Sequence, residues 1–265
     1  SGNITTNETG GGAFRGDFDV LAGVNDTLTL SGVISGGGKL NAVNDGTIIF
    51  DGSAANTFGT FILGDGGVSS FDGASGNKHG FVVVNRSDAL GSGNIVSRGS
   101  QLQAGVAGIN VPNNIIVEGG GLRFGGSNSF ELSGDITIEN STRGISNYGL
   151  YSVTVTLSGN IDLDDNGSPR NILFQGSNGK NNGEFIVSGV ISDGAVNATV
   201  TVDGNFDNGD VFFTGNNTYS GTTTISAGTL HIGDGGTSGT VGDGTGNVVN
   251  NSALIFNRSD DHTVT

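Results

Sequence analysis

Two short motifs contain residue types that bind partners or ions. The first, Arg15-Gly16-Asp17, spells the tripeptide that many integrins recognise. A match of three residues is a weak signal, because the composition predicts about 0.1 copies of this tripeptide by chance. The sequence therefore supports two interpretations of this tripeptide, a cell-binding loop or a loop that is merely solvated.

The second motif places oxygen ligands at calcium-loop spacing. Residues 162–167 spell the first half of a helix-loop-helix calcium loop, with Asp162, Asp164 and Asn166 at the first three ligand positions. The closing Glu is missing, since Leu173 stands at the twelfth position, and the flanking residues are typical of strands. The segment therefore does not match the complete helix-loop-helix calcium motif. A looser Ca²⁺ site and an ordinary turn remain the two alternatives, and no other cofactor is expected.

Catalytic arrangements are not evident. His79, His231 and His262 are scattered and lack a metal-binding spacing such as H-E-x-x-H. No G-x-S-x-G segment occurs. We therefore expect that the protein is not an enzyme. Because His231 alternates with Leu230 and Ile232, it should point outward if they point inward.

Composition excludes several classes of protein. The 265 residues include 51 Gly but only two Pro, and no Cys, Met or Trp. Glycine without a three-residue period is not collagen, and the lack of Cys excludes disulfide frameworks and thiolate metal sites. The 25 acidic residues against 10 basic ones give a net charge of −15. This charge argues against nucleic acid as a partner, since phosphate binding needs a basic surface.

Short apolar runs predict strands along the whole chain. Segments such as 47–50, 81–84, 153–157 and 222–225 are β-branched or aromatic and are bounded by Gly, Asn, Asp or Ser. No window has helical apolar spacing. Strands this short suit a solenoid, in which each coil packs only on its neighbours. With about 20–25 residues per coil we expect roughly 11–13 coils, essentially no α-helix and one continuous unit over residues 1–265.

Internal repeats support this architecture. A pattern of apolar-Ser-Gly-x-Ile occurs at 30–34, 132–136, 157–161 and 187–191. The Gly should face the interior and leave room for the chain to bend. Residues 62–67 and 85–88 are echoed at 231–236 and 257–260. We expect the 15 Phe to stack inside the coils and Asn to form ladders along them.

The segment 215–236 closely resembles the passenger-associated repeat of bacterial autotransporters. It reads GNNTYSGTTTISAGTLHIGDGG, and the best-matching region extends over 208–265. Residues 56–61 resemble a decayed copy, with Phe58 in place of Tyr. The residues that match the family motif, which we interpret as structural, are Asn217, Thr218, Tyr219, Ser220, Gly221, Gly228, Thr229 and Leu230.

The resemblance implies a right-handed parallel β-helix that is exported to the bacterial cell surface. It also implies a C-terminal outer-membrane barrel in the full-length chain, and the two ends predict a piece of that longer protein. We expect a stalk that supports adhesion, self-association or biofilm formation and export-coupled folding. Its partner would be a host or neighbouring-cell surface protein or glycan, or a second copy. The alternative is a glycan-binding or polysaccharide-cleaving β-helix.

Overall fold

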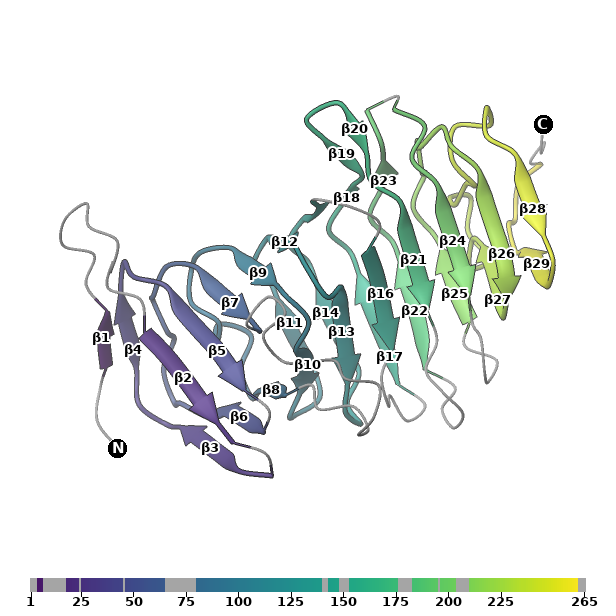
Figure 1. Ribbon diagram of the computed structural model, residues 1–265. Coiled ribbons are helices and arrows are strands. Elements are labelled where there is room, and N and C mark those ends of the chain that lie inside the picture. The colour runs from purple at the N-terminus through teal and green to yellow at the C-terminus, as the bar shows by residue number, and fades with distance from the viewer. Residues whose placement is uncertain are drawn as a thin grey trace.

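The protein is a solenoid of stacked parallel strands (Figure 1). The computed structural model describes residues 4–6, 18–23, 25–44, 46–64, 80–139, 143–147, 153–175, 183–194, 196–203 and 210–261. Over these residues every regular element is a strand, so the expected all-β class is confirmed. In the same residues no helix is long and apolar enough to cross a membrane.

Three long parallel sheets form the walls of the solenoid. The ten-stranded sheet contains β3 (Thr27–Leu30), β6 (Thr47–Phe50), β8 (Phe81–Val84), β10 (Gln101–Ala104), β13 (Leu122–Gly125), β16 (Arg143–Asn147), β21 (Ile172–Gln175), β24 (Val200–Asp203), β26 (Thr223–Ala227) and β28 (Val248–Asn250). The seven-stranded sheet contains β11 (Ile109–Val111), β14 (Phe130–Leu132), β17 (Thr154–Leu157), β22 (Glu184–Val187), β25 (Asp210–Phe213), β27 (Thr229–Ile232) and β29 (Ala253–Phe256). The eight-stranded sheet contains β2 (Phe18–Ala22), β5 (Leu40–Asn44), β7 (Phe61–Leu63), β9 (Ile95–Ser97), β12 (Ile115–Val117), β15 (Ile136–Ile138), β18 (Ile161–Asp162) and β23 (Ile191–Ser192).

Two short pairs complete the strands. β1 (Ile4–Thr6) lies parallel to β4 (Ile34–Gly36). β19 (Asp164–Asp165) and β20 (Ser168–Pro169) form an antiparallel hairpin. In the middle of the molecule the chain runs from the ten-stranded to the seven-stranded and then to the eight-stranded sheet, as β13, β14 and β15 do.

Coil length varies although the register is kept. Thr27 pairs with Thr47, 20 positions later, whereas Thr47 pairs with Phe81, 34 positions later. The longest sheet has ten strands in the described residues, fewer than the 11–13 coils expected, because several coils carry extra residues between strands. The right-handed sense of the coil stays a prediction.

Alternation along the strands fills the interior. In β6, β8, β17, β22, β25 and β27 every second side chain is buried and the others are half-buried. This is the two-residue period of a pleated strand. Phe124, Phe174 and Phe213 are at most 1% exposed. Phe174 packs edge-on against Phe213 with ring centroids 5.6 Å apart, so the expected interior stacking is confirmed for these side chains. It does not extend to all the Phe residues, because Phe212 is half-buried on the outward side and Phe256 is 41% exposed.

Three of the four apolar-Ser-Gly-x-Ile repeats, at 132–136, 157–161 and 187–191, form the corner between the seven-stranded and eight-stranded sheets, whereas the copy at 30–34 joins β3 to β4. A Cβ at Gly134, Gly159, Gly189 or Gly215 would overlap the backbone carbonyl of the coil before it. The Gly of this repeat therefore lets successive coils approach closely. The neighbouring coil occupies the space that the absent side chain leaves, and the expected role of this Gly in bending the chain stays a prediction.

Polar side chains beside these glycines form a ladder along the corner. Oδ1 of Asn114 accepts a hydrogen bond from the backbone N–H of Asp135, at 3.0 Å. Oδ1 of Asp135 accepts from Asn160 N at 2.9 Å, and Oδ1 of Asn160 from Val190 N at 3.0 Å. The expected ladder of Asn side chains is confirmed here, with Asp at one step.

Candidate functional site

The family-motif residues lie in a corner where they join successive coils. Asn217 is only 2% exposed. Its Oδ1 accepts a hydrogen bond from Ile191 N in the preceding coil at 2.9 Å. Its Nδ2 donates to the carbonyl of Thr240 in the following coil at 2.8 Å. Thr218 N donates to Ile191 O at 2.9 Å, so one dipeptide holds both backbone groups of Ile191.

The next two motif residues bind buried polar partners. The phenol of Tyr219, 1% exposed, shares a hydrogen bond of 2.6 Å with Thr223 Oγ1. Burial raises the pKa of Tyr219 above its ordinary value, and the Thr223 hydrogen bond opposes this in part. Ser220 donates from both N and Oγ to Asp193 Oδ2, each at 2.9 Å. Asp193 is 1% exposed and also accepts from Ala198 N, so its buried carboxylate is hydrogen-bonded.

The remaining motif residues have backbone and packing roles. A Cβ on Gly221 would overlap the carbonyl of Ala198 in the preceding coil. Gly228 has a φ of 77°, which L side chains rarely adopt, and ends the turn before β27. Thr229 and Leu230 begin β27, and Leu230 is fully buried.

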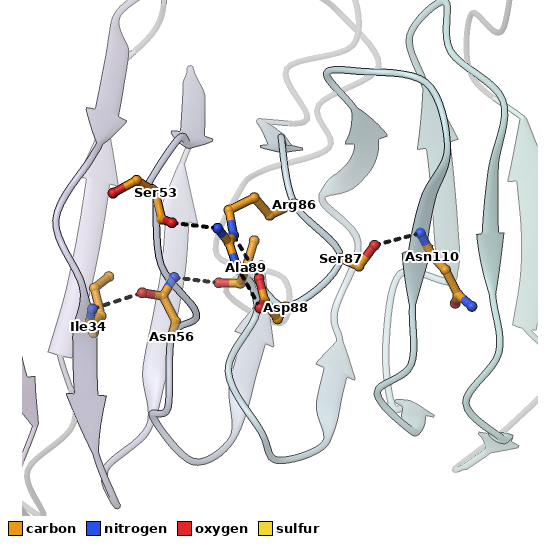
Figure 2. A network of polar contacts seen from close by, with 8 residues as sticks. All are labelled: Ile34, Ser53, Asn56, Arg86, Ser87, Asp88, Ala89 and Asn110. Atoms are coloured by element: carbon orange, nitrogen blue, oxygen red, sulfur yellow. Dashed lines mark hydrogen bonds and ion pairs between the residues drawn. The ribbon is translucent and has the colours of Figure 1, made fainter.

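The segment around Asn56 makes the same contacts, as Figure 2 shows in part. Asn56 Oδ1 accepts from Ile34 N at 2.8 Å, and its Nδ2 donates to Ala89 O at 2.7 Å. Thr57 N donates to Ile34 O at 2.9 Å. Phe58, fully buried, follows Thr57 as Tyr219 follows Thr218. The resemblance of residues 56–61 to the motif therefore extends to its hydrogen bonds, and we call Asn56 and Asn217 the coil-locking asparagines.

An Arg–Asp fork accompanies each of the two segments. Arg86 donates from Nε and Nη2 to the carboxylate of Asp88, both at 2.8 Å, and from Nη1 to Ser53 O of the preceding coil at 2.7 Å (Figure 2). Arg258 likewise donates from Nε and Nη2 to the two carboxylate oxygens of Asp260. The hydrogen bond from Arg86, with desolvation opposing it, keeps the pKa of Asp88 below its ordinary value.

Of the two sequence-predicted sites, the structure describes the segment with Asp162, Asp164 and Asn166. Arg15-Gly16-Asp17 lies outside the described residues. Asp162 Oδ1 accepts from Asp164 N at 3.0 Å, and Asp164 Oδ1 accepts from Gly167 N at 2.6 Å. Asn166 has a φ of 53° at the tip of the β19–β20 hairpin.

The expected Ca²⁺ ligands lie in and beside the β19–β20 hairpin. Across the described ranges, no three His, Cys, Asp or Glu gather where they could hold a metal ion. The hydrogen bonds of Asp162 and Asp164 described above bind the backbone of the hairpin itself. Calcium binding by Asp162, Asp164 and Asn166 stays a prediction.

Three neighbouring side chains, Phe212, His231 and Asp210, lie on the outward side of the seven-stranded sheet. The sequence predicted only the outward position of His231. His231 is half-buried on the outer side, as its alternation with buried Leu230 and Ile232 predicts. Its ring stacks on Phe212, with centroids 4.3 Å apart and planes 13° from parallel. Its Nε2 lies 3.3 Å from Asp210 Oδ2. Only the pairing of β25 with β27 shows that these three residues are neighbours.

Comparison with known proteins gives two matches. Residues 207–232 match the family model of the passenger-associated-transport-repeat. The chain is also 38% identical over 116 residues to the adhesin BmaC autotransporter of Brucella suis biovar 1 (strain 1330). That alignment covers 44% of this chain but only 3% of the relative. No solved structure matches the chain. Together with the parallel solenoid, these two similarities support the expected resemblance to an autotransporter passenger that carries passenger-associated transport repeats.

Proposed function

We propose that this chain is a stalk segment that supports adhesion or self-association at the bacterial surface. The relative with 38% identity is named an adhesin, and binding rather than catalysis is the activity proposed here. Similarity to an autotransporter passenger indicates export through the outer membrane to the cell surface. In the full-length protein a C-terminal outer-membrane barrel would hold the passenger there.

A structural mechanism is supported by the hydrogen bonds that the motif side chains make to neighbouring coils. The coil-locking asparagines Asn56 and Asn217 are buried, and each bonds to the coil before it and the coil after it. Because such contacts join only neighbouring coils, they stiffen a rod without requiring a large globular core. The rod then displays its outer faces to partners, which we propose are a host or neighbouring-cell surface protein or glycan, or another copy.

The test compares cells that display the full passenger with cells that display it without residues 1–265. Surface display is measured by antibody labelling, and adhesion and aggregation are measured on the same cells. Normal display with reduced adhesion or aggregation is the expected result. Normal display with unchanged adhesion and aggregation would refute the proposal, because the segment would then be only a spacer.

A further inference from the structure

An in-register row of apolar and aromatic side chains crosses the outer face of the seven-stranded sheet. Ile186 pairs with Phe212, Phe212 with His231, and His231 with Ile255. All four occupy the outward positions of the strands β22, β25, β27 and β29. Parallel neighbours lie about 4.8 Å apart, so the four residues form one continuous stripe.

The stripe is partly accessible to solvent. Ile255 is 44% exposed, and the side chain of His231 is 16% exposed. The stacked rings of Phe212 and His231 hold one another in place, so the stripe has a fixed shape. Rigid aromatic side chains cost little conformational entropy on binding, and they are enriched in the central part of protein interfaces.

Carboxylates border the stripe. Asp210 starts β25 with its side chain 30% exposed, and Glu184 starts β22 on the same outward side. Glu131 stands further along the row, at the outward position of β14. None of the seven strands contains Lys or Arg. The face therefore offers negative charge beside apolar surface, with His231 beside Asp210 as the one basic side chain in its strands.

We propose that this face, Ile186, Phe212, His231 and Ile255 with Asp210 and Glu184, docks a basic polypeptide segment whose Lys or Arg side chains alternate with apolar ones. The inference rests on the proposed adhesive function and names the chemistry of its partner. Complementary charge steers such a partner to the face, and the apolar stripe supplies the buried centre of the contact. A second copy fits poorly, because a chain of net charge −15 would bring carboxylates against carboxylates.

The probe is a fluorescein-labelled peptide of alternating lysine and leucine, titrated with the chain and followed by fluorescence anisotropy. One comparison peptide alternates lysine with glycine, and another alternates glutamate with leucine. The lysine–leucine peptide should bind at least about tenfold more tightly than either, which corresponds to about 1.4 kcal/mol. Its affinity should fall as salt is raised, because the charge pairs are exposed.

Variants on the face are matched by variants on another wall. Phe212→Ser and Ile255→Ser should each weaken binding of the lysine–leucine peptide, and so should Asp210→Asn with Glu184→Gln. Leu173→Ser and Asp203→Asn make the same kinds of change on outward positions of the ten-stranded sheet and should leave binding unchanged. Circular dichroism checks folding. Ile255 is already exposed, so its replacement keeps the test valid if Phe212→Ser is unstable.

Three results would overturn the proposal. Equal binding of the lysine–leucine and lysine–glycine peptides would show attraction by net charge alone. Equal losses of peptide affinity in Phe212→Ser and Leu173→Ser would show that this face is not the binding site. Concentration-dependent dimerisation abolished by Ile255→Ser would assign the face to a second copy. Any of these outcomes with adhesion still lost on deletion of residues 1–265 would leave the proposed stalk function standing.

Discussion

Replacing Asn217 with Ala tests the role of the coil-locking asparagines most directly. The side chain supplies an acceptor to Ile191 N and a donor to Thr240 O, and the residue is 2% exposed. Alanine leaves both backbone groups without these partners. A buried polar group left unsatisfied costs about 1–3 kcal/mol. Thr240 is half-buried, so water recovers part of its bond, and the expected loss is about 2–4 kcal/mol.

Two measurements check this loss. Urea unfolding of the variant gives the global free energy, since the midpoint falls in proportion to stability. A repeat array can unfold in parts, so hydrogen exchange of the Ile191 amide is followed as well. This amide should exchange at least about tenfold faster in the variant, because opening that costs 1.4 kcal/mol less is tenfold more populated.

The neighbouring residue provides the control. Asn216 is exposed and accepts one hydrogen bond from Gly239 N at 3.1 Å, so Asn216→Ala should cost less than about 1 kcal/mol. Asn56→Ala should match the loss at Asn217, because it bridges Ile34 and Ala89 in the same way. Equal losses at Asn216 and Asn217, or no change in exchange at Ile191, would refute the reasoning.

Three further substitutions test the corners of the solenoid, each by urea unfolding. Gly159→Ala should destabilise by about 1–3 kcal/mol or more, because the new Cβ would overlap the carbonyl of Gly134. Tyr219→Phe should cost about 1–3 kcal/mol, since it leaves the buried Thr223 hydroxyl without this partner while keeping the ring. Val190→Asn should stabilise by about 0.5–1 kcal/mol, because it gives the corner ladder an acceptor for the next coil.

Each of these predictions has a contrasting substitution. Gly37→Ala should be tolerated, because a Cβ there meets nothing within 4 Å; a cost equal to that of Gly159→Ala would contradict the close-approach argument. Tyr219→Leu loses the ring as well and should cost more than Tyr219→Phe. Val190→Ala gives no acceptor, so a gain there as large as in Val190→Asn would disprove the ladder explanation.

Local patterns predicted which way side chains point. The alternation of Leu230, His231 and Ile232 placed His231 outward because a strand has a fixed two-residue period. The same alternation predicted buried Phe174 and Phe213. These results depend only on residues that are adjacent in sequence.

Relations between coils were harder to predict. Phe212 and His231 are 19 positions apart, whereas Ile186 and Phe212 are 26 apart, so no constant period reveals the stripe. The spacing of the Ser-Gly repeats was visible, but the carbonyl that lies against Gly159 belongs to another coil. Side-chain partners were likewise hidden, as for Asn217, because they depend on which residues the register brings together.

The irregular coil length indicates that this fold tolerates insertions during evolution. The coil from Thr47 to Phe81 holds 34 residues, yet the coil before it holds 20, and both keep every strand pair in register. Each doubling of a flexible loop costs only about 0.6 kcal/mol. Additional residues can therefore be inserted between strands while the wall strands and the coil-locking asparagines keep their contacts. The outer surface of this rod can therefore change by insertion while the paired wall strands keep their structure.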